Sequence, residues 1–149
     1  DKVVELMAHQ AYYQGGIRFK EGHGWAHDWF CHWASEDDLI FWNIHSDTPR
    51  RWEVILKYTC PQDQIGSDIS LAIGDQEIVI PLDQAYQPEK IPSPDRVPRQ
   101  EVYEQTWATF KIGHMILPAG SQQIRLQATN IKGQQVAEVK SLILKEVKE

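Results

Sequence analysis

The segment from Glu21 to Trp33 is the part of the chain richest in side chains able to do chemistry, with three of the six tryptophans and three of the six histidines. Trp25, Trp29 and Trp33 recur every fourth residue, so a helix would stack them on one face, whereas in a strand or loop they would partly share a side. The apolar faces of sugar rings pack on indole rings, while neighbouring polar side chains bind the hydroxyls. The segment therefore predicts a sugar-stacking platform. The alternative is core packing, and we expect at least one of the three rings in the core.

The histidines of this segment, His23, His27 and His32, raise the question of a metal centre or a catalytic site. Imidazole is a preferred zinc ligand, but the spacing matches no zinc signature, and the glycines around His23 oppose the helix on which such a pair would converge. The chain has no nucleophile-elbow, zinc-protease or phosphate-loop motif. We therefore expect no catalysis and no cofactor. A small enzyme using these histidines would require all three to converge in a cleft.

A proline-rich stretch lies between Tyr86 and Val102, and its four prolines can neither continue a helix nor occupy a central strand, which predicts a long loop. Arg96 and Arg99 near its end could bind a sulfate or carboxylate through charge-assisted hydrogen bonds. Their acidic neighbours favour the other interpretation, in which ion pairs pin the loop. If the loop binds a ligand, Tyr86, Arg96 and Arg99 are the residues expected to supply polar or anionic contacts.

The rest of the chain alternates apolar and polar residues with the period of half-buried strands. Trp52, Val54, Leu56 and Tyr58 fall on one face of the first such strand. Strands are predicted at 52–58, 69–73, 78–82, 107–117, 124–128 and 136–147, with turns at 60–63, 74–75 and 118–120, a solvated acidic turn at 36–38 and a hairpin closed by 130–133. No βαβ unit, repeat or linker is present. The pattern predicts one all-β domain over residues 1–149, an antiparallel β-sandwich.

Composition limits the partners of this domain. The chain has 15 basic and 21 acidic residues, a balance that argues against nucleic acid. No apolar run approaches the roughly 20 residues needed to cross a bilayer, and the N-terminus lacks a charged region followed by an apolar stretch, so we expect a soluble segment without a membrane partner. Cys31 and Cys60 permit one disulfide, a question that the sequence leaves open.

Several short motifs together resemble the β-sandwich accessory domain at the C-terminus of bacterial type I formylglycine sulfatases, which is itself similar to galactose-binding-like carbohydrate-binding modules. The motifs are Tyr-Gln-Gly-Gly-Ile-Arg-Phe-Lys at 13–20, Asp-Leu-Ile-Phe-Trp at 38–42, Trp-Glu-Val-Ile-Leu-Lys-Tyr-Thr-Cys-Pro at 52–61, Gly-Ser-Asp-Ile at 66–69, Asp-Arg-Val-Pro-Arg at 95–99, Leu-Pro-Ala-Gly at 117–120 and Leu-Gln-Ala-Thr at 126–129. The resemblance covers most of the chain. It implies a jelly-roll sandwich.

The resemblance also implies what this chain lacks. The formylglycine motif, Cys or Ser followed by x-Pro-x-Arg, is absent, so the catalytic domain of such a sulfatase is not in this chain. Related modules often hold a structural calcium through acidic residues of the first and last strands. Glu5 matches the first, but the last strand has Glu138 and Lys140 without a clear Asp. That departure argues against calcium.

These observations and the resemblance together predict a non-catalytic carbohydrate-binding module from a secreted or periplasmic polysaccharide-degrading enzyme. The expected partners are a polysaccharide, with sulfated polysaccharides among the candidates, and the catalytic domain of the parent enzyme. The alternative is a structural domain that packs on a catalytic partner, buries the same aromatic residues and arginines, and has no glycan affinity of its own. A large exposed apolar patch would favour that alternative.

Overall fold

The computed structural model describes residues 2–22, 25–87 and 106–148. Almost all of its regular structure is β-strand, as the alternating pattern predicts. The strands are β1 (Val3–Met7), β2 (Tyr12–Gln14), β3 (Arg18–Phe19), β4 (Phe30–Cys31), β5 (Leu39–Ser46), β6 (Arg50–Thr59), β7 (Ser67–Ile73), β8 (Gln76–Leu82), β9 (Ala108–Leu117), β10 (Gly120–Asn130) and β11 (Glu138–Glu146). Two short 3₁₀ turns, η1 (Ala8–Gln10) and η2 (Gln62–Gln64), complete the described elements. No helical segment in this part of the chain is long and apolar enough to span a bilayer.

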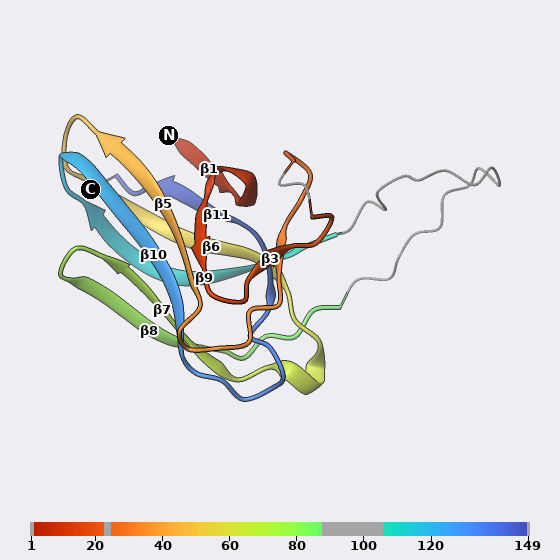
Figure 1. Ribbon diagram of the computed structural model, residues 1–149. Helices are drawn as coiled ribbons and strands as arrows, with labels where there is room; N and C mark the ends of the chain where they lie inside the picture. The colour runs from red at the N-terminus through yellow and green to blue at the C-terminus, as the bar shows by residue number, and fades with distance from the viewer. Residues whose placement is uncertain (1, 23–24, 88–105, 149) are drawn as a thin grey trace.

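The strands form two antiparallel sheets that pack face to face (Figure 1). One sheet has the order β3-β4-β11-β6-β9, with β1 also paired to β11, and the other has the order β2-β5-β10-β7-β8. The core between them contains large, fully buried side chains from both sheets, including Trp42, Tyr58 and Ile124. This architecture confirms the predicted antiparallel β-sandwich.

Strand β6 shows how the sequence pattern produces the fold. Trp52, Val54, Leu56 and Tyr58 are all buried, as their alternation predicts. The pairing of β6 with β9 shifts register between Val54 and Ile55, at a β-bulge. Strands β7 and β8 form the predicted hairpin around residues 74–75, with Ile69 opposite Ile80 and Leu71 opposite Ile78. The final run is a strand, β11, as expected.

The hairpin predicted at 130–133 is wrong. Strand β10 pairs with β5 and β7, whereas β11 pairs with β1, β4 and β6. The connection between them therefore crosses from one sheet to the other. Alternation shows that a segment has one buried face, but it does not show which sheet the segment joins.

The acidic run at 36–38 also departs from the prediction of a solvated turn. Glu36 and Asp37 are exposed, but Asp38 is buried. Its carboxylate accepts hydrogen bonds from the backbone N–H of Gly16 (2.7 Å), Ala34 (3.1 Å) and Ser35 (3.0 Å). Asp38 therefore joins the segment after β2 to the segment before β5. The predicted proline-rich loop falls mainly on residues 88–105, which lie outside the described residues.

Candidate functional site

The connection between β3 and β4 carries Trp25 on its surface. The Trp25 side chain is 58% exposed, and the His27 ring contacts it edge-on at 5.6 Å between ring centroids. Asp28, which is fully buried, organises the connection: its Oδ1 accepts the N–H groups of Glu21 and Trp29, both at 2.9 Å. The Asp28 N–H donates to the Trp25 carbonyl at 2.9 Å. A buried carboxylate thus fixes the backbone that presents an exposed indole.

A second, half-buried indole lies close to this connection. Trp107 immediately precedes β9, and its ring meets that of Trp29 at 5.1 Å and 75°. Trp29 is only 5% exposed, and its Nε1 donates to Glu138 Oε1 at 2.6 Å. The buried Trp29 ring therefore packs against the half-buried Trp107 ring.

Tyr86 belongs to the same end of the sandwich. Its backbone pairs with that of Cys60, just after β6, through two 2.8 Å hydrogen bonds. Its hydroxyl lies 2.7 Å from Thr106 Oγ1, next to Trp107. Strand pairing brings Trp29 to the same end of the sandwich. Its hydrogen-bond partner Glu138 lies opposite Thr59, the residue before Cys60. We call this group the aromatic end: Trp25, Trp29, Tyr86 and Trp107.

The structure corrects the predicted platform of three tryptophans. Trp33 is fully buried and Trp29 nearly so, which leaves only Trp25 of the three with an exposed ring. Residues 25–33 form neither a helix nor a continuous strand, because a turn at residues 26–27 precedes the two-residue strand β4 and His32 has a left-handed backbone (φ 61°). The expectation that at least one of the three packs in the core is confirmed. Trp107 was not among the expected binding residues, because its position at the start of an alternating run predicts part of a strand.

Some of the other predicted site residues lie within the part of the chain that the structure describes, and some lie outside it. Arg96 and Arg99, with the ion pairs expected to pin them, lie outside the described residues. His23 also lies outside them. His27 contacts Trp25, and His32 Nδ1 lies 3.1 Å from the Cys31 sulfur. Within residues 2–22, 25–87 and 106–148, no three His, Cys, Asp or Glu side chains gather in a way that could hold a metal ion.

The two cysteines are buried free thiols, so no disulfide joins them. Cys60 Sγ donates to the Val136 carbonyl at 3.4 Å. Burial, with a smaller contribution from Asp63, raises the pKa of the Cys60 thiol to about 11, and burial also raises the pKa of Cys31. Both thiols are therefore protonated at neutral pH and are poor nucleophiles.

The residues implied as calcium ligands do not fit such a site. Glu5 Oε2 accepts a 2.6 Å hydrogen bond from Ser141 Oγ and lies 3.4 Å from Lys57 Nζ. Glu138 binds Trp29 through Oε1, and its Oε2 lies 3.9 Å from Lys20 Nζ. Lys140, on the last strand, directs its ammonium at the carbonyl oxygen of His27, 2.9 Å away. A divalent cation there would face a fixed positive charge.

The outer face of the five-stranded sheet carries a second aromatic surface. Tyr12 is 57% exposed and stacks on Phe41 with 5.2 Å between ring centroids. Arg125 of β10 lies opposite Phe41 on the side away from Tyr12. Two residues along β5, Gln14 and Gln127 lie opposite Leu39, one on each side. Sequence reasoning overlooked this face, although the polar alternation of 123–127 already indicated that β10 has a polar outer side.

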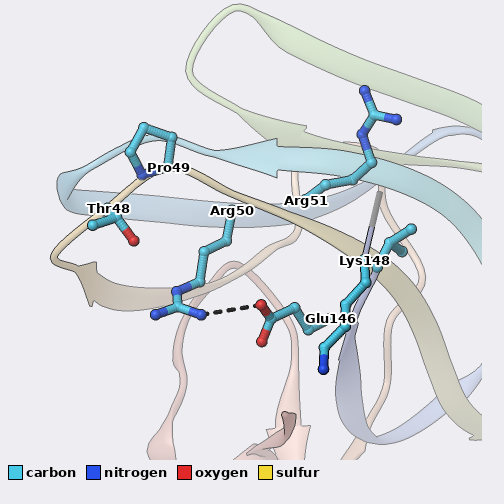
Figure 2. Close-up of a pocket in the computed structure, with 7 residues that line it drawn as sticks. Thr48, Pro49, Arg50, Arg51, Glu146 and Lys148 are labelled. Carbon is cyan, nitrogen blue, oxygen red and sulfur yellow. Dashed lines mark hydrogen bonds and ion pairs between the residues drawn. The ribbon is translucent and has the colours of Figure 1, made fainter. Parts of the chain in front are cut away.

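A pocket of about 580 Å³ lies elsewhere, by the β5–β6 turn and the end of β11 (Figure 2). It is lined by Thr48, Pro49, Arg50, Arg51, Glu146, Val147 and Lys148. Arg50 and Glu146 form a 3.1 Å ion pair within it. Because β6 is ten residues long, the pocket lies roughly 30 Å from the end of β6 next to Tyr86. Among the described residues, no aromatic side chain lines the pocket, and Trp25, Trp29, Trp33 and Tyr86 all lie outside it.

No protein-family profile and no curated protein sequence matches this chain. Solved structures do match. A family 35 carbohydrate-binding module from Clostridium thermocellum superposes with a TM-score of 0.66 at 14% identity, covering 99% of this chain and 100% of that chain. A GH26-CBM35 β-(1,4)-mannanase from Podospora anserina gives 0.64 at 13% identity, covering 99% of this chain and 28% of the enzyme. The mosquito-larvicidal Cry4Aa toxin of Bacillus thuringiensis gives 0.66 at 11% identity, with 99% and 24% covered.

These comparisons give the chain the fold of a carbohydrate-binding-module β-sandwich. At such identities they establish the architecture alone, and the same architecture also occurs within an insecticidal toxin. The chain spans about a quarter of the mannanase and toxin chains and the whole length of the bacterial module. The matched structures provide no link to formylglycine sulfatases.

Proposed function

We propose that this chain is a non-catalytic carbohydrate-binding module whose site is the aromatic end of the sandwich. The observation that carries the proposal is the Trp25 indole, 58% exposed on a backbone that the buried Asp28 fixes from below. Leaving a large ring exposed on an ordered backbone is what stacking on a sugar ring requires, because little conformational entropy is lost on binding. Trp107, half-buried on Trp29, supplies a neighbouring apolar surface.

The fold supports the same function. A family 35 carbohydrate-binding module matches the whole chain, and a mannanase carries a domain of this architecture within a longer enzyme. We therefore propose that this module serves a catalytic domain, and that the parent enzyme is a sulfatase or another polysaccharide-degrading enzyme that acts outside the cytoplasm. Among the described residues, no three His, Cys, Asp or Glu side chains gather in a way that could hold a catalytic metal ion.

The ligand class follows from two hydroxyl groups at the aromatic end and from the residue types that follow Tyr86 in the sequence. Tyr86 and Thr106 place two hydroxyl groups 2.7 Å apart beside Trp107, where they can bind sugar hydroxyls. Arg96 and Arg99 follow Tyr86 in the chain, and their guanidinium groups suit sulfate or carboxylate. We propose a polysaccharide ligand, with sulfated chains as the preferred class.

A glycan array with neutral and sulfated polysaccharides tests this function. The wild type is expected to bind, and Trp25→Ala to lose most of the signal while keeping its thermal unfolding midpoint. Tyr12→Ala is the matched control, because Tyr12 is equally exposed but lies on the outer face of the five-stranded sheet. Loss of signal in Tyr12→Ala alone would move the site to that face. A wild type that binds no glycan would instead support a domain that packs on a catalytic partner.

A further inference from the structure

Lys140 lies at an irregular position of β11, where it contacts the loop that carries Trp25. The register of β11 against β6 shifts between Val139 and Ser141, so Lys140 has no direct partner in that pairing. Its half-buried side chain reaches the β3–β4 connection, where Nζ donates to the His27 carbonyl at 2.9 Å and lies 3.5 Å from the Asp28 carbonyl. One ammonium thus contacts two successive main-chain oxygens.

Two main-chain carbonyl oxygens contact this half-buried ammonium, and nearby carboxylates act on its charge. The carboxylates of Glu5 and Asp28 both favour the charged form of Lys140, whereas burial, the largest effect, and Lys57 lower its pKa. Glu5 is held in place by Ser141 Oγ at 2.6 Å, next to Lys140 in the chain. Main-chain carbonyl and carboxylate oxygens are the ligands that hard cations such as calcium take in proteins, and two such carbonyls contact Lys140 Nζ.

We infer that the Lys140 ammonium is a built-in cation that joins the Trp25 loop to β11, so that the domain is stable without a bound metal ion. A metal would have to bind within a few ångströms of a fixed positive charge, and its most available carbonyl ligand is already bound by Lys140. Lys140 is in this sense a positioning residue. The inference concerns the fold and does not depend on the proposed glycan binding.

Thermal unfolding of the full chain tests it. The wild type is expected to unfold at the same Tm in excess EDTA and in millimolar calcium. Lys140→Met removes the ammonium that donates to the His27 carbonyl and contacts the Asp28 carbonyl, and is expected to lower Tm by ~3–8 °C in both buffers. The matched control is Lys111→Met, on the exposed side of β9, with no change in Tm expected. A wild type that calcium stabilises, or a Lys140→Met variant as stable as Lys111→Met, would overturn the inference.

A gain of metal dependence gives an independent test. Lys140→Asp replaces the ammonium with a carboxylate beside the same carbonyls and Glu5, which creates an oxygen-rich site of the kind calcium binds. This variant is expected to be less stable than the wild type in EDTA and to regain Tm in calcium, because a ligand that binds only the folded state stabilises it. A calcium response in neither protein, or in both, would contradict the assignment of this site to a cation that Lys140 replaces.

Discussion

Asp28 is the side chain on which the geometry of the aromatic end depends. It is fully buried, yet its Oδ1 accepts two backbone N–H groups at 2.9 Å, one from Glu21 and one from Trp29. Hydrogen bonds to a charged acceptor are among the stronger ones in proteins, and buried donors left without an acceptor are costly. Asp28 therefore fixes the backbone between the exposed ring of Trp25 and the buried ring of Trp29.

We expect Asp28→Ala to lower the free energy of unfolding by about 2–4 kcal/mol, because the buried N–H of Trp29 and the partly buried N–H of Glu21 lose a charged acceptor. Urea unfolding followed by tryptophan fluorescence measures this loss. The exposed Asp37 provides a matched control, with less than about 0.5 kcal/mol expected for Asp37→Ala. Equal losses for the two variants would show that the Asp28 carboxylate does not organise this loop.

The buried thiol of Cys60 predicts how stability depends on pH. Burial raises its pKa from 9.0 to about 11, so the folded state keeps a proton that the unfolded state releases. Stability is therefore unaffected below pH 9 and falls as the pH rises from 9 to 11, with a slope of up to about 1.4 kcal/mol per pH unit for this group. Tyr58, whose pKa burial raises to about 12, adds a similar fall above pH 10.

Urea unfolding of the wild type and Cys60→Ala between pH 8 and about 11 checks this contribution. The variant loses packing at every pH, so the informative quantity is the slope of stability against pH rather than its level. A shallower slope is expected for Cys60→Ala between pH 9 and 11. Identical slopes would show that the thiol does not titrate differently in the two states.

At the scale of elements, the contact between Gly15 and Asp38 joins the segment after β2 to the start of β5. Gly15 has φ +92°, and a Cβ built on it would collide with Asp38 Oδ1. We expect Gly15→Ala to lower the free energy of unfolding by about 2–4 kcal/mol, since backbone strain and a steric clash both act. Chemical denaturation measures the loss.

Gly22 is the matched control for that substitution. It has φ +79°, and a Cβ there would meet nothing within 4 Å. Gly22→Ala is therefore expected to cost about 1 kcal/mol, from the backbone conformation alone. If the two alanine variants were equally stable, the Asp38 contact would not be the reason for glycine at position 15.

Alternation in the sequence predicted the strands well because each has one buried face. Trp52, Val54, Leu56 and Tyr58 show this directly. It failed at 130–133, since a buried face does not identify the neighbouring strand. The spacing of Trp25, Trp29 and Trp33 also gave a wrong prediction of a shared face, because a turn and the left-handed residue His32 interrupt the period. Which indole is exposed depends on the contacts of Asp28 and Trp107, which are far from evident in local sequence.

For the molecule as a whole, one core between two sheets predicts one cooperative unit. Residues from β1 to β11 contribute to the same buried cluster. Calorimetry of the full chain is expected to show a single transition with an enthalpy of about 100 kcal/mol near 60 °C, equal to the van't Hoff value. Two resolved transitions would contradict the prediction of a single domain.

The proposed binding site, too, depends on the whole sandwich, because the aromatic end draws on the β3–β4 connection, the segment after β8 that carries Tyr86, and Trp107 just before β9. We propose that the exposed indole of Trp25 anchors a glycan there. Isothermal titration with the glycan that gives the strongest array signal measures it most directly. We predict that Trp25→Ala weakens affinity at least ~10-fold, the cost of truncating an aromatic anchor, while Tyr12→Ala binds as the wild type does. Equal affinities for the wild type and a folded Trp25→Ala variant would contradict this account.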